Sequence, residues 1–142
     1  MRNENFERAV SKILKSDNRY PRAAYEMLPI VLDYTVRKLH ESGRKKANHI
    51  SSGHVTGAQL SEGFRDYILE EFGPFSQEIL EDLRIYTTLD IGNLVYNLIA
   101  VGCFGKTEED KLEDFDNVYN FYEAFVEPFK VKNPSFPQAD YL

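Results

Sequence analysis

The stretch from Thr56 to Pro74 constrains the fold more than any other part of the chain, because it carries both a helix start signal and a helix stop signal. Thr56 and Gln59 match a capping box, in which the threonine oxygen accepts from a first-turn amide and the glutamine reaches back. Between these signals, apolar side chains recur every three or four residues. Gly73 and Pro74 then end the pattern. This stretch therefore predicts a well-specified amphipathic helix.

Periodic stretches on both sides predict further helices. Residues 4–15 carry a short amphipathic pattern, and a longer pattern begins near Pro21 and ends near Gly43. Pro29 lies inside the longer pattern, where its missing amide predicts a kink or a break into two helices. The other expected helices are residues 74–83 and residues 88–101, the second capped by Thr87 or Thr88.

Beyond Gly102 the helical signals weaken. The segments CFGKT and NVYNF can pair across the acidic stretch between them as an antiparallel ribbon, although a helix over residues 117–126 fits nearly as well. Two helices followed by such a ribbon have the order of a winged helix-turn-helix unit. The sequence therefore predicts a mainly α fold of five to six helices with a small C-terminal β-hairpin, winged-helix-like over residues 74–121.

The totals favour one domain. The chain has 142 residues, of which 42% are hydrophobic, and this is enough for one buried core. We expect a single helical domain over residues 1–127 and an extended, Pro-containing tail over residues 128–142. Cys103 is the only cysteine, which excludes an internal disulfide. The polar start of the chain and the absence of a long apolar run predict a cytoplasmic protein with no membrane segment.

Charge is distributed unevenly along the chain. Residues 1–56 hold 11 Lys and Arg against 6 Asp and Glu, whereas residues 57–142 hold 6 against 17. The first part is therefore basic and the second strongly acidic. Such asymmetry favours an unknown protein partner of opposite charge, or a homo-oligomer in which the two parts meet, although two solvated faces explain it equally well.

The sequence Gly105-Lys106-Thr107 matches the end of a phosphate-binding loop. That loop needs a glycine five positions before the glycine that precedes the lysine, and this chain has Ala100 there. It must also open a helix, where free amides bind phosphate, whereas this segment follows a helix and precedes a run of acids. The pattern therefore favours a turn near a helix C-terminus, and we predict no nucleotide cofactor.

Two groups of residues suggest metal ligands without matching a known metal site. The acids of residues 108–116 offer oxygens for a hard cation, but a count from Asp114 places Tyr119 where a calcium loop needs glycine. The histidines at 40, 49 and 54 match no usual zinc spacing. We expect a solvated acidic loop, a structural role for His54 near the Thr56 cap, and no metal.

No arrangement of residues indicates nucleophilic or acid-base catalysis. Cys103 follows an apolar helix, where a thiol is more often buried and inert, and adjacent Arg65 and Asp66 diverge on a helix. Nucleic-acid binding is unlikely through the winged unit, since residues 85–105 contain no Lys or Arg. It would instead need the basic region of residues 37–46.

Several blocks resemble a known family. YPRAAYEML, HVTGAQLSEGFRDYILEEFGPF, TTLDIGNLVYNLI and GKTEEDKLEDFDNVYNFYEAF are similar to small uncharacterised bacterial proteins found chiefly in the planctomycete and verrucomicrobial lineages. The likeness runs from about Tyr20 to Phe129, and Thr56 stands where the family has serine, which leaves the capping role intact. It implies a bacterial cytosolic protein and carries no activity or ligand residue to this chain.

These features predict a non-catalytic binding or regulatory module that contacts another protein. One alternative is a nucleic-acid-binding protein that uses the basic residues of 37–46. The other is an enzyme or metal-dependent protein that uses His54, Arg65 and the acids of residues 108–116. We predict no catalytic residue, and the candidate ligand or partner contacts are Arg37, His54, Arg65, Asp110 and Asp114.

Overall fold

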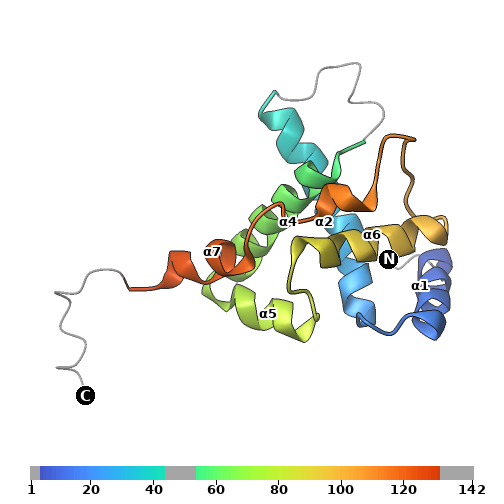
Figure 1. The fold of residues 1–142 in the computed structure, drawn as a ribbon, viewed down its shortest axis with the longest axis horizontal. Coiled ribbons are helices and arrows are strands. Elements are labelled where there is room, and N and C mark those ends of the chain that lie inside the picture. Colours follow the sequence, from blue (N-terminus) through green and yellow to red (C-terminus); the bar gives the residue numbers. More distant parts are fainter. Residues whose placement is uncertain (1–3, 44–53, 132–142) are drawn as a thin grey trace.

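The computed structural model describes residues 4–43 and 54–131, and within these residues every regular element is helical (Figure 1). None of the described helices has the length and apolar character needed to cross a membrane. In chain order the elements are α1 (Glu4–Ser16), α2 (Arg22–Glu41), α4 (Gly57–Phe72), η1 (Gly73–Phe75), α5 (Ser76–Asp82), α6 (Thr88–Ala100), η2 (Leu112–Phe115), α7 (Phe121–Phe125) and η3 (Glu127–Phe129).

The helix start and stop signals are confirmed at α4 and α6. Thr56 Oγ1 accepts from the Gln59 amide at 3.0 Å, and Gln59 Oε1 accepts from the Thr56 amide at 2.9 Å. At α6 the cap is Thr87, whose hydroxyl accepts from the Asp90 amide at 3.2 Å. Gly73 ends α4 with a φ of 49°, a left-handed value that glycine adopts at low cost.

The helix α2 continues through Pro29, so the expected break into two helices is wrong. Proline removes one amide donor from a helix, and this loss disfavours but does not forbid continuation. Side chains on both sides of Pro29, such as Leu28 and Val31, are fully buried, and this packing holds the two halves of α2 in one helix.

The most extensive contact between two described elements is that of α2 with α4, and it depends on a glycine. A Cβ atom at Gly63 would lie 1.8 Å from Thr35 Oγ1 and 2.7 Å from Thr35 Cβ. Thr35 is buried on α2, and its hydroxyl donates to the Val31 carbonyl at 2.7 Å. The two helices can therefore approach this closely only because position 63 has no side chain.

The core lies where α1, α2, α4 and α6 meet, with α5 closing one end. Its largest members are fully buried, which removes their apolar surface from water at about 25 cal/mol per Å². They come from helices far apart in the sequence and from the segment before α6, and they belong to one core cluster of the described residues. They are Tyr25, Leu28, Phe64, Ile68, Ile85, Ile91, Leu94 and Leu98.

The predicted C-terminal β-hairpin is wrong, and with it the winged-helix-like arrangement of residues 74–121. None of the described residues forms a strand, and residues 103–111 instead form a loop that leads into η2 and α7. Side chains satisfy the backbone here: Asp114 accepts from the Lys111 amide at 3.0 Å, and Asn120 caps α7 through the Glu123 amide at 3.0 Å. Because these backbone amides donate to side chains, they do not form the backbone hydrogen bonds that a ribbon would need.

The alternative to the ribbon, a helix over residues 117–126, is confirmed in part, because α7 lies within these residues. Of the tail expected over residues 128–142, η3 extends to Phe129, and residues 132–142 lie outside the described residues.

A polar edge of α6 contacts the segment between α1 and α2. Asp90 accepts from the hydroxyl of Tyr20, and the same hydroxyl accepts from Asn93 Nδ2 at 2.9 Å. Burial, and then the bond to Asp90, raises the pKa of Tyr20, so this phenol stays protonated and donates. One turn further along, Asn97 Nδ2 donates to Asp17 at 2.9 Å and to the Tyr25 hydroxyl at 3.0 Å.

Asp17 connects this edge to the end of α1. Its carboxylate accepts from Arg19 Nη2 at 2.8 Å and from the Arg19 amide at 3.0 Å, in addition to Asn97. The side-chain bond to Arg19 holds the pKa of Asp17 well below its usual range, against the opposing effect of burial. The carboxylate therefore stabilises the fold while it is ionised.

Replacing Gly63 by alanine tests the α2–α4 approach. Ala has the better helix propensity, by about 1 kcal/mol, but the added Cβ has no space beside Thr35. We expect the free energy of unfolding to fall by about 1–3 kcal/mol, measured by urea denaturation. Gly105→Ala is the matched control, because nothing lies within 4 Å of its Cβ position. Equal stability of the two variants would contradict the close approach.

Replacing Asp17 by asparagine tests its charge. Since the pKa of Asp17 is depressed in the folded state, its contribution is present above about pH 4, the usual aspartate value, and is lost as the pH falls through the lower folded value. Wild type and Asp17→Asn should therefore differ in unfolding free energy at pH 7 and converge in acid. Asp33→Asn, at an exposed pair with Arg37, is the control. A difference that does not change with pH would rule out the charge effect.

Candidate functional site

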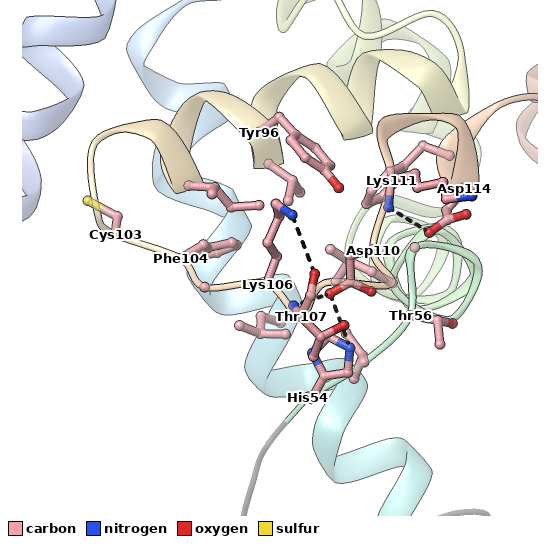
Figure 2. Close-up of a pocket in the computed structure, with 18 of the residues that line it drawn as sticks. His54, Thr56, Tyr96, Cys103, Phe104, Lys106, Thr107, Asp110, Lys111 and Asp114 are labelled. Atoms are coloured by element: carbon pink, nitrogen blue, oxygen red, sulfur yellow. Dashed lines mark hydrogen bonds and ion pairs between the residues drawn. The ribbon is translucent and has the colours of Figure 1, made fainter.

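A cleft of about 730 Å³ opens between α2, the start of α4, α6 and the loop of residues 103–111 (Figure 2). Its volume falls within the usual range of about 300–1,000 Å³ for small-molecule sites. Most of its lining is apolar, and polar groups come mainly from the loop and from residues 54–56. The apolar lining residues are Pro29, Leu32, Val36, Val55, Leu60, Val95, Ile99, Phe104 and Phe115.

The side of the cleft formed by residues 103–115 is fixed through Phe115. This ring is buried against Gly92, where a Cβ atom would lie 2.7 Å from Phe115 Cβ. The Thr88 hydroxyl donates to the Phe115 carbonyl at 2.6 Å and accepts from the Val118 amide at 3.1 Å. A single buried hydroxyl thus satisfies two backbone groups and holds η2 on the first turn of α6.

His54 and Asp110 meet at the edge of the cleft. His54 Nε2 lies 3.4 Å from Asp110 Oδ2, and the same oxygen accepts from the Thr107 amide at 2.8 Å. Asp110 therefore closes a turn and also contacts the segment before α4. The contact joins two parts of the chain that are 56 residues apart, and the structural role expected of His54 stays a prediction.

Asp114 lines the same cleft but acts within its own turn. Its carboxylate accepts from the Lys111 amide at 3.0 Å, and its own amide donates to the Lys111 carbonyl at 3.1 Å. Thus two of the acids predicted as contacts, Asp110 and Asp114, organise the backbone of the loop. Within residues 4–43 and 54–131, no three His, Cys, Asp or Glu side chains come together as metal ligands.

Tyr96 and Lys106 bring hydrogen-bond donors to the cleft. The Tyr96 hydroxyl oxygen is inaccessible to solvent and has no hydrogen-bond partner among the described residues. Burial, and then the charges of Asp110, Asp114 and Glu113, raise the pKa of Tyr96, so it stays a donor. Lys106 Nζ makes one long bond of 3.4 Å, to the Thr107 carbonyl. Figure 2 shows both side chains directed toward the middle of the cleft.

The sequence pattern did not indicate Tyr96, and it predicted Lys106 only as part of a turn near a helix C-terminus. Lys106 lies beyond the C-terminus of α6, where Gly102 has a φ of 81° and the Cys103 amide donates to the Leu98 carbonyl at 2.8 Å. The prediction that this segment follows a helix end is therefore confirmed. Tyr96 gave no signal, because one tyrosine on an amphipathic helix is typical of ordinary packing.

Arg65 and Arg37 lie outside the cleft. The expected divergence of Arg65 and Asp66 is wrong, because Arg65 Nε is 3.1 Å from Asp66 Oδ1. The Arg65 guanidinium also lies over the Tyr119 ring, 5.4 Å from the centroid. Arg37 Nε pairs with Asp33 at 3.1 Å on the exposed side of α2. The structure therefore brings His54, Asp110 and Asp114 together and leaves both arginines elsewhere.

Cys103 lines the cleft with a protonated thiol. Burial raises the pKa of Cys103, which lowers the fraction of the reactive thiolate at neutral pH. Figure 2 shows its sulfur directed away from the Lys106 and Asp110 side chains. The residues Arg44, Lys45 and Lys46 of the predicted basic region lie outside the described residues.

Comparisons with protein-family models, with curated proteins and with solved structures found no match. The resemblance to small bacterial proteins stays a prediction. The geometry of the cleft is therefore the basis for the function proposed below.

Replacing Thr88 by valine tests how the loop is held. Valine keeps the shape but leaves the Phe115 carbonyl and the Val118 amide without their bonds, which costs about 1–3 kcal/mol. We expect lower stability and faster amide hydrogen exchange over residues 103–118. Thr107→Val, at an exposed position in the same loop, should change stability by less than about 0.5 kcal/mol. Unchanged exchange in Thr88→Val would show that this hydroxyl does not hold the loop.

Proposed function

We propose that this chain is a non-catalytic binding module and that its ligand occupies the cleft between α2, α6 and residues 103–111. The observation that carries the proposal is the combination of apolar walls with two donors, Tyr96 and Lys106, that have no side-chain acceptor among the described residues. Binding sites commonly combine a mainly apolar surface with a few polar groups that orient the ligand.

The state of the polar groups supports binding over catalysis. Asp110 and Asp114 accept from backbone amides of their own turns, which gives both carboxylates a structural role. The Cys103 thiol has a raised pKa, the opposite of what activates a nucleophile. The enzyme alternative required Arg65 to act with His54 and the acids, but Arg65 pairs with Asp66 outside the cleft.

Three further hypotheses stay predictions. A protein partner and self-association through the uneven charge both follow from the sequence alone. Nucleic-acid binding through residues 37–46 has less support, because Arg37 already pairs with Asp33 and the rest of the acidic chain would repel phosphates.

A cleft-filling variant tests the proposal. Val36 lines the cleft on α2, so Val36→Trp should occupy it, whereas Ile30→Trp adds the same side chain at an exposed position of the same helix outside the cleft. We would titrate a library of small fragments into ¹⁵N-labelled protein and map the amide shifts. Hits should cluster at residues 54–57 and 95–111 in wild type and in Ile30→Trp, and disappear in Val36→Trp.

Spectral dispersion away from the cleft checks that Val36→Trp remains folded. Shifts that scatter over the surface, or that persist unchanged in a folded Val36→Trp, would overturn the proposal.

A further inference from the structure

We infer that the cleft binds a small monocarboxylic acid with an apolar body, and that the carboxylate accepts from Lys106 Nζ and the Tyr96 hydroxyl. This inference rests on the proposed function, because it names the chemistry of the ligand that the same cleft would hold. Four observations carry it: a buried phenol without a partner among the described residues, a lysine with no acidic partner among them, the charge balance of the lining, and the apolar walls.

The Tyr96 hydroxyl is the most informative group. A buried polar group without a partner costs about 1–3 kcal/mol, so such groups in folded proteins have a reason to be kept. Its raised pKa makes it a donor, and the matching group is therefore an acceptor. The hydroxyl oxygen is covered in this structure, so an acceptor reaches it only when the side chains around it rearrange.

Lys106 supplies the positive charge. Its ammonium lies on the loop side of the cleft and forms no ion pair with another described residue. The long bond to the Thr107 carbonyl leaves donor capacity on an ammonium that has three hydrogens. A carboxylate has two oxygens, which gives one acceptor to the ammonium and one to the phenol.

The charge of the lining disfavours a dianion more strongly than a monoanion. Among the described lining residues, Lys106 and Lys111 face three carboxylates, those of Asp33, Asp110 and Asp114, and no arginine. Phosphate is dianionic and is usually bound by several cations or by a helix N-terminus, so this lining would repel it. The Thr107 amide donates to Asp110 Oδ2 at 2.8 Å, which lowers the repulsion felt by a single carboxylate.

The apolar walls determine the rest of the ligand. Leu32 and Val36 of α2 line the same cleft as Ile99 of α6 and Phe104 of the loop. Each CH₂ group that such a wall covers contributes about 0.8 kcal/mol. An aliphatic or aromatic body of a few carbon atoms therefore fits this surface better than a sugar or another highly polar body.

The test uses octanoate as the acid probe and 1-octanol as its uncharged match. Each is titrated into ¹⁵N-labelled full-length protein, and the amide shifts of residues 95–111 give the dissociation constant. We expect octanoate to bind at least tenfold more tightly than 1-octanol. Lys106→Met should weaken octanoate by about tenfold or more while it leaves octanol unchanged, since a charge-assisted bond contributes about 1.5–3 kcal/mol. Lys12→Met, on α1 away from the cleft, is the matched control.

Tyr96→Phe provides a second readout. Because the hydroxyl has no partner in the free protein, its removal should leave the melting temperature unchanged or raise it, while octanoate affinity falls about threefold to tenfold. A loss of stability together with unchanged affinity would overturn the assignment of Tyr96 to the ligand.

Other outcomes separate this inference from the proposed function. If octanoate and octanol bind the cleft equally and Lys106→Met changes neither, the carboxylate assignment is overturned and the binding module remains. If neither probe shifts residues 95–111 although fragments bind there, the acid chemistry is overturned alone. A tripeptide ending in leucine, tested beside its amide, covers the C-terminal carboxylate of a peptide. Tighter binding of that peptide than of octanoate would overturn the assignment to a free small acid.

Discussion

The contact between Phe115 and Gly92 determines how the second half of the chain is arranged. A glycine on α6 lets the Phe115 ring lie directly against the helix, and the neighbouring Thr88 hydroxyl bonds to the Phe115 carbonyl. The loop of residues 103–111 is therefore fixed at both ends, by the end of α6 and by η2 (Figure 1). One side of the cleft exists only because this loop is held away from α2.

The helix α6 connects this arrangement to the rest of the molecule. Its buried face fills the core with Ile91, Leu94 and Leu98, and its polar edge binds the segment before α2 through Asn93 and Asn97. Hydrogen bonds have stricter geometry than apolar contacts, so the polar edge fixes the rotation of α6 about its axis. The same rotation directs Tyr96 toward the cleft, which links the folding of this helix to the proposed site.

The acids of the loop illustrate how one residue type can serve structure and electrostatics together. Asp110 and Asp114 each close a turn by accepting a backbone amide, as aspartate often does outside helices. After burial, their charge raises the pKa of Tyr96 further, and the same charge disfavours ligands of high negative charge in the cleft. The two lysines beside them reduce that field at the cleft.

The sequence by itself determined where most of the helices begin and end, because the signals are local: the Thr56–Gln59 capping box, the stop at Gly73 and the cap at Thr87 each act within a few residues. The sequence also predicted that Lys106 follows a helix, because the end of a helix is likewise marked by local signals. Tertiary structure alone decided the path of residues 103–120, because a ribbon and a helix fitted the sequence pattern nearly equally. The contact of Phe115 with Gly92, 23 positions earlier in the chain, holds this segment in a path that forms neither a strand nor a wing. Tertiary structure also decided which polar residues meet. His54 meets Asp110, and Tyr96 and Lys106 line one cleft, only after α2, α4 and α6 have packed. No spacing along the chain encodes a contact made by the packing of whole helices.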